Sequence, residues 1–124
     1  MVKEILLVGV GGGAGSILRY LTSRTTVQLF DTQWYFLGTF AVNIIGCFLI
    51  GLFSGFLMSY YPNNQLLKFL FITGFCGGYT TFSAFAFENL RLIELEQWWL
   101  LLAYVLASVV VGIIAVWLGM KIVQ

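Results

Sequence analysis

The chain has 124 residues, of which 60% are hydrophobic and only 9% carry a charged side chain. This composition excludes an ordinary soluble domain, because such a domain needs a charged, mixed surface. The formal net charge is +1 and the chain has no histidine, so it offers no basic surface for nucleic acid and no histidine metal site or catalytic triad. We therefore predict an all-α integral membrane protein, with residues 1–124 forming a single domain.

Four stretches are apolar enough to cross a membrane, since a helix needs about 20 apolar residues to span ~30 Å of hydrocarbon. They run from Ile5 to Leu21, from Trp34 to Tyr60, from Leu66 to Phe87 and from Trp98 to Ile122. The second stops before Pro62, because proline disfavours helical backbone at the preceding residue. The N-terminal stretch resembles a signal peptide in outline, but the spans that follow favour its retention as a first transmembrane helix.

Positive charges divide almost evenly between the two sides of this four-helix layout. The N-terminus, the second connection and the C-terminus share one side. That side carries Lys3, Lys68 and Lys121, while the other side carries Arg24 and Arg91, with Arg19 near it. The positive-inside rule sets the orientation of a membrane protein through an excess of Lys and Arg on one side, and a chain without that excess can insert in either orientation. We therefore expect two antiparallel copies to pair around a two-fold axis in the membrane plane.

Glycines recur at a spacing of four residues, which lets helix backbones approach closely. The pairs are Gly9 and Gly13, Gly11 and Gly15, Gly51 and Gly55, and Gly74 and Gly78. Together they predict a tightly packed oligomer rather than a lone bundle.

Arg19 is the most deeply placed charge, and we expect no carboxylate near the middle of a span. The acidic residues are terminal or in predicted connections: Glu4, Asp31, Glu88, Glu94 and Glu96. A proton-coupled exporter of cationic drugs needs a membrane carboxylate, so this asymmetry favours an anion as the transported ion. Alternatively, Arg19 extends to the interface and anchors the first span.

Two helical faces carry polar residues at a spacing of four. The first face holds Thr39, Asn43 and Cys47, and the second holds Tyr104, Ser108 and Gly112. These stripes either line an aqueous path or bond neighbouring helices, and Ser108 can also bond a carbonyl of its own helix. The two cysteines, Cys47 and Cys76, lie in apolar stretches and read as small apolar residues.

The segment GFCGGYTTFSAF interrupts the third span. We expect the helix to break between Gly77 and Thr80, beginning at the glycine pair, because glycine tolerates unusual backbone angles. Freed carbonyls suit a hard cation and freed amides suit an anion. Hydroxyls follow the glycines, and Phe82 and Phe85 share one face, where positive ring edges can meet a small anion. On spacing alone, ordinary packing of these rings is the competing interpretation.

Three segments resemble, in order, the signature segments of the Fluc (CrcB-type) fluoride channel family. They are GGGAGSILRY (Gly11–Tyr20), GTFAVNIIGCFLIG (Gly38–Gly51) and GFCGGYTTFSAF (Gly74–Phe85). The resemblance covers nearly the whole chain, including its length and four-span layout. Two departures, Cys47 in place of the common serine and Ala84 in place of a hydroxyl residue, affect only local polar contacts.

The resemblance implies a dual-topology homodimer with two antiparallel fluoride pores and a central structural sodium ion. It implies pore roles for Phe82, Phe85, Asn43, Thr81, Ser83, Tyr104 and Ser108, to which the polar face of the second span adds Thr39. Arg19 corresponds to the family's arginine at the vestibule. Gly77 and Thr80 would hold the sodium through their backbone carbonyls.

The function that follows is passive fluoride export across the bacterial inner membrane, needing lipid and a second copy but no other protein partner. No phosphate-binding GxxxxGK[ST] loop is present and nothing resembles an enzyme's catalytic constellation. Two alternatives stay open: a small multidrug-type exporter, and a structural subunit that only packs in a complex. Selective fluoride flux without a proton gradient separates the channel from both.

Overall fold

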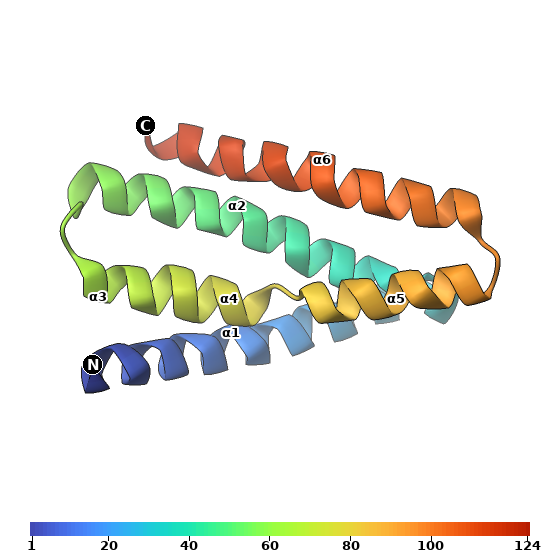
Figure 1. The fold of residues 1–124 in the computed structure, drawn as a ribbon, viewed down its shortest axis with the longest axis horizontal. Coiled ribbons are helices and arrows are strands. Elements are labelled where there is room, and N and C mark those ends of the chain that lie inside the picture. The colour runs from blue at the N-terminus through green and yellow to red at the C-terminus, as the bar shows by residue number, and fades with distance from the viewer.

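The computed structural model describes all 124 residues, and its regular structure is entirely helical. Four long helical segments run alongside one another (Figure 1), and each is long and apolar enough to cross a membrane. In chain order the elements are α1 (Val2–Leu29), the short 3-10 turn η1 (Thr32–Trp34), α2 (Phe36–Tyr60), α3 (Gln65–Lys68), the π-helical η2 (Phe69–Cys76), α4 (Gly77–Tyr79), α5 (Phe82–Glu94) and α6 (Trp98–Val123). The predicted all-α, four-span architecture is confirmed.

Two helices are longer than predicted. α1 continues through residues assigned to the first connection and ends at Leu29, and α5 continues past Phe87 to Glu94. In α1 the hydroxyl of Thr22 donates to the Leu18 carbonyl at 2.9 Å, and that of Thr26 donates to the Thr22 carbonyl at 2.8 Å. These hydroxyls form hydrogen bonds with carbonyls of their own helix. The polar residues that were assigned to a connection are therefore part of α1.

The chain termini and the α2–α3 connection lie at one end of the bundle, and the α1–α2 and α5–α6 connections lie at the other (Figure 1). Lys3, near the N-terminus, and Lys121, in the last turn of α6, are therefore at the same end as Lys68 of α3. Arg91, in the last turn of α5, is at the opposite end. The predicted division of positive charge between the two ends is confirmed.

Glycines bring α1 against the third span. A Cβ placed on Gly11 would lie 2.9 Å from the Phe75 amide nitrogen, and one on Gly78 would lie 2.9 Å from the Gly12 Cα. These distances leave no room for a side chain, so the two backbones pack directly against each other. The α2–α6 contact is built the same way, since a Cβ on Gly51 would lie 2.9 Å from the Val116 carbonyl carbon.

Gly9 and Gly13 make no such contact, because a Cβ on either would have no neighbouring atom within 4 Å. They share a face of α1 that is exposed along with Val10 and Ile17. Of the four predicted glycine pairs, this one therefore leaves its face open while the other three pack inside the chain.

The third span is broken as predicted, but the break begins further along the chain. Gly77 and Gly78 are helical, and the interruption falls on Thr80 (φ −86°, ψ 160°) and Thr81 (φ −148°, ψ 118°). Figure 1 shows this extended link between α4 and α5, roughly midway along the span. No glycine has a positive φ, so Gly78 serves the close approach of α1 rather than an unusual backbone angle. The break therefore begins at Thr80, the last residue of the predicted stretch, and the expectation that the glycine pair itself interrupts the helix was wrong for this reason.

Candidate functional site

A cavity of about 450 Å³ lies between α2, the broken third span and α6, where the helix interruption opens space beside it. Its lining includes eight residues that the sequence singled out, namely Asn43, Cys47, Gly77, Thr80, Thr81, Phe82, Phe85 and Ser108. The polar faces of α2 and α6 therefore do converge on the break. The remaining predicted residues, Ser83, Thr39, Tyr104 and Arg19, lie outside this lining.

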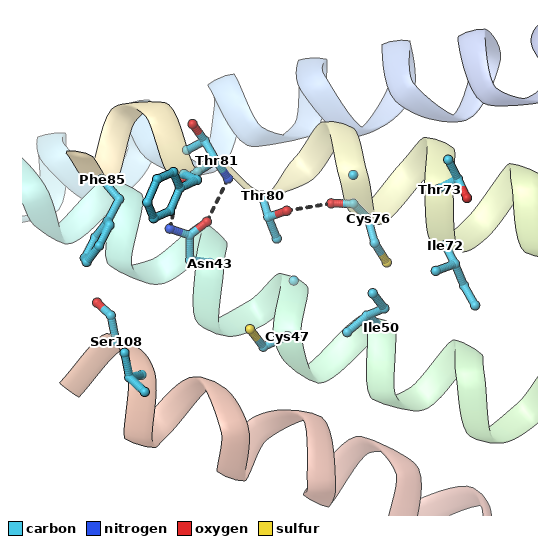
Figure 2. A pocket seen from close by; sticks show the side chains of 14 residues that line it. Asn43, Cys47, Ile50, Ile72, Thr73, Cys76, Thr80, Thr81, Phe85 and Ser108 are labelled. Carbon is cyan, nitrogen blue, oxygen red and sulfur yellow. Dashed lines mark hydrogen bonds between the residues drawn. The ribbon is translucent and has the colours of Figure 1, made fainter. Parts of the chain in front are cut away.

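The Asn43 side chain clamps the peptide groups of Thr81. Its Nδ2 donates to the Thr81 carbonyl at 3.0 Å, and its Oδ1 accepts from the Thr81 amide at 2.8 Å (Figure 2). The break removes the helical partner of the Thr81 amide, and the Asn43 oxygen replaces it, since a buried peptide group needs a partner. The Thr81 carbonyl, which begins the hydrogen bonding of α5, receives the Asn43 amide proton in addition. Asn43 thus both bonds a neighbouring span and lines the cavity, so the two alternatives raised by the sequence hold together.

Thr81 begins α5 as its N-cap. Its Oγ1 accepts from the Ala84 amide at 3.2 Å and lies 3.3 Å from the Ser83 hydroxyl oxygen. A threonine in extended conformation at this position is a favoured cap because its hydroxyl satisfies one free amide of the first turn. α5 therefore starts at the cavity with the positive end of its peptide dipoles directed there.

The two phenylalanine rings lie on one face of α5, as their spacing predicted. Their centroids are 5.9 Å apart with an interplanar angle of 43°. Phe85 is half-buried and meets the Tyr104 ring edge-to-face at 5.0 Å and 70°, whereas Phe82 is 78% exposed. One ring is therefore held by packing within the chain, and the other projects to where lipid or a second protein surface must cover it.

Ser108 carries a buried hydroxyl without a hydrogen-bond partner. It does not bond its own helix, which was the ordinary interpretation of a serine in a membrane span. In Figure 2 its hydroxyl points from α6 toward Phe85 across the cavity. A buried hydroxyl with no protein partner costs free energy, so Ser108 has a donor available to a molecule or ion that enters the cavity.

Glu88 lies in the middle of α5 and is only 9% exposed, contrary to the expectation that it lies in a connection. The Thr39 hydroxyl donates to its Oε2 at 2.6 Å, and the Tyr104 hydroxyl donates to its Oε1 at 2.8 Å. The expectation that Glu88 lies in a connection was therefore wrong, because the third span continues to Glu94 and Glu88 lies within its last part rather than near its middle. The sequence could have indicated this burial through helical spacing. Residues at intervals of three and four share one helical face, and this face holds Thr81, Phe85, Glu88 and Leu92.

A carboxylate buried in the bundle weakens the sequence argument against a cation exporter, which assumed that every acidic residue is terminal or in a connection. Both oxygens of Glu88 are instead already occupied by hydroxyl donors, and no basic side chain pairs with it.

Arg19 is half-buried on α1 and forms no ion pair; the one salt bridge in the chain joins the N-terminal amine to Glu4 at 2.9 Å. α1 continues well beyond Arg19, so this residue is further from the helix end than the sequence indicated.

Backbone carbonyls are freed on the approach to the break. The Thr81 amide turns to Asn43, so the Gly77 carbonyl loses the partner that a continuous helix would supply. The neighbouring Gly78 carbonyl accepts from Ser16 Oγ at 3.4 Å, and the Cys76 carbonyl accepts from the Thr80 hydroxyl at 2.9 Å. The Gly77 carbonyl is thus available to a hard cation, and Thr80 follows in the extended link, so oxygen donors of the kind that sodium binds lie at the break.

Comparison with known proteins gives matches over almost the whole chain. The family described as CrcB-like protein, Camphor Resistance (CrcB), matches residues 6–120. The chain is 45% identical over 121 residues to a protein of Flavobacterium psychrophilum named fluoride-specific ion channel FluC, covering 98% of this chain and 97% of the relative. Relatives with the same name are 42% identical in Azobacteroides pseudotrichonymphae, over 96% of this chain and 94% of the relative, and 38% identical in Methylobacillus flagellatus, over 98% and 94%.

Proposed function

The chain belongs to the CrcB-like family, and from this premise we propose that it is a fluoride-selective channel for passive export of cytoplasmic fluoride. Its relatives are named as ion channels rather than enzymes, and the chain has four membrane-spanning helices. The likeness covers nearly the full length of both proteins, so it includes every element that lines the cavity.

The main support for this proposal is the geometry of the cavity. In it, the Ser108 hydroxyl has no hydrogen-bond partner and points toward the Phe85 ring. Fluoride is small and tightly hydrated, so it enters a pore only where donors replace its water. Ring edges are electropositive and a hydroxyl donates a hydrogen bond, so both favour an anion. Neither carries a full charge, and several weak contacts let an ion leave as well as bind.

The proposed pore extends from the break along α5 and α6. Its residues are Phe82, Phe85, Asn43, Thr81, Ser83, Tyr104, Ser108 and Thr39, with Arg19 at a vestibule. The driving force is the membrane potential, which is worth ~2.3 kcal/mol per charge per 100 mV. A negative interior expels fluoride without a coupled ion, and the proposed location is therefore the membrane that carries this potential, the bacterial inner membrane.

Two antiparallel copies form the proposed conducting unit, with two pores at their interface. Three features support this arrangement: the near-equal positive charge at the two ends, the open Gly9 and Gly13 face, and the exposed ring of Phe82. The charge distribution allows a second copy to insert in the inverted orientation, and that copy would cover both the open glycine face and the exposed ring. A sodium ion at that axis would be held by the Gly77 and Thr80 carbonyls, where it would neutralise their partial charge and join the copies.

Purified protein in liposomes, read with a fluoride-selective electrode, tests the channel. We expect fluoride efflux without a proton gradient and little chloride flux. Flux that requires a proton gradient would indicate an exporter, for which the buried Glu88 is the relevant observation. If no fluoride flux were observed, the remaining interpretation would be a structural subunit that only packs in a complex.

A further inference from the structure

We propose that Glu88 is a positioning residue of the anion path, acting through the Thr39 and Tyr104 hydroxyls. This inference rests on the proposed channel function and deepens it. The Glu88 carboxylate receives the Thr39 proton at 2.6 Å from α2 and the Tyr104 proton at 2.8 Å from α6. One side chain of α5 thereby ties three helices together beside the cavity.

The direction of these bonds decides what the two hydroxyls can do. A hydroxyl has one proton, and both protons already point at the carboxylate. Toward the path, Thr39 and Tyr104 therefore present only lone pairs, which an anion does not bind. Ser108, whose hydroxyl has no partner, remains the free donor of this region. Thr39 and Tyr104 flank the path without binding the ion, because Glu88 accepts the proton that each hydroxyl would otherwise donate to it.

The Tyr104 ring contacts Phe85, so the hydrogen bond that holds Tyr104 also affects the position of Phe85. Phe85 stands edge-to-face on Tyr104 at 5.0 Å, and Phe36 packs against the same ring at 5.2 Å. Tyr104 is 4% exposed, so its ring is enclosed and its hydroxyl fixes the remaining rotation. Fixing Tyr104 in turn fixes the orientation of the Phe85 ring, on which ion binding by its edge depends.

Glu88→Gln tests the inference with little change in size. The glutamine oxygen accepts one hydroxyl proton, but its nitrogen cannot accept the other, so one hydroxyl becomes a free donor. We expect a folded protein with fluoride efflux slowed by about tenfold, equivalent to ~1.4 kcal/mol in the barrier, and with reduced selectivity over chloride. Glu94→Gln is the matched control, because Glu94 is exposed on the same helix, and it should conduct as the unmodified protein does.

Tyr104→Phe and the double variant Glu88→Gln/Tyr104→Phe separate positioning from simple packing. If Glu88 acts through Tyr104, the double variant should be no slower than the slower single variant, because both changes release the same ring. Additive losses with unchanged selectivity would overturn the inference, as would a Glu88→Gln protein with normal flux and normal selectivity. Absence of fluoride flux in the unmodified protein would instead reject the channel itself, so the two failures are distinguishable.

Discussion

Asn43→Ala should destabilise the folded chain, because the Asn43 carboxamide is the hydrogen-bond partner of the helix break. The substitution removes bonds of 3.0 Å and 2.8 Å to the carbonyl and the amide of Thr81. Thr81 is 8% exposed, so water reaches these groups poorly once the side chain is gone. An unsatisfied buried polar group costs ~1–3 kcal/mol, so leaving the Thr81 amide without a partner should lower the free energy of unfolding by about that amount.

Thermal unfolding of the purified protein in detergent, followed by circular dichroism, measures this loss. Asn43→Asp refines the test, because an aspartate still accepts from the Thr81 amide but cannot donate to its carbonyl, and its loss should therefore differ from that of alanine. Asn63→Ala in the exposed α2–α3 connection is the matched control and should leave the melting temperature unchanged. If Asn43→Ala melted with the Asn63→Ala control, the clamp would contribute nothing and the reasoning would be refuted.

Three further predictions concern the glycines and the rings. Gly78→Ala should lower the unfolding free energy by ~1–3 kcal/mol in the same melting assay, because its Cβ meets the Gly12 backbone, whereas Gly77→Ala should be tolerated, since its nearest neighbour would be 3.9 Å away. Equal melting of the two variants would contradict the packing argument. Phe82→Ile and Phe85→Ile should each abolish fluoride efflux from liposomes while leaving the melting temperature within a few degrees, because an aliphatic side chain has no electropositive ring edge; normal flux in both would reject the rings as ion contacts. Gly13→Leu should leave the fold of one chain intact, because its face is open, but should shift cross-linked dimer toward monomer; undiminished dimer would remove this face from the interface.

Local sequence was enough for the elements that depend on composition and helical spacing. The four spans follow from apolar length, which is a property of each segment alone. The shared face of Asn43 and Cys47 follows from a spacing of four, and both line the cavity. The presence of a break in the third span was likewise readable, although its exact position was not.

Only the tertiary structure decided which partners these residues meet. Asn43 bonds Thr81 across 38 residues of sequence, and Thr39 bonds Glu88 across 49, so neither pairing has a local signal. Gly77 and Gly78 are indistinguishable in sequence, but only Gly78 faces the α1 backbone. In the sequence Glu88 looked like the start of a connection, because burial of a carboxylate depends on donors that other helices bring to it. Span length and periodicity are local properties. Hydrogen-bond partners and the space for a side chain depend instead on how distant segments pack, and that packing decided where the break, the cavity and the buried carboxylate lie.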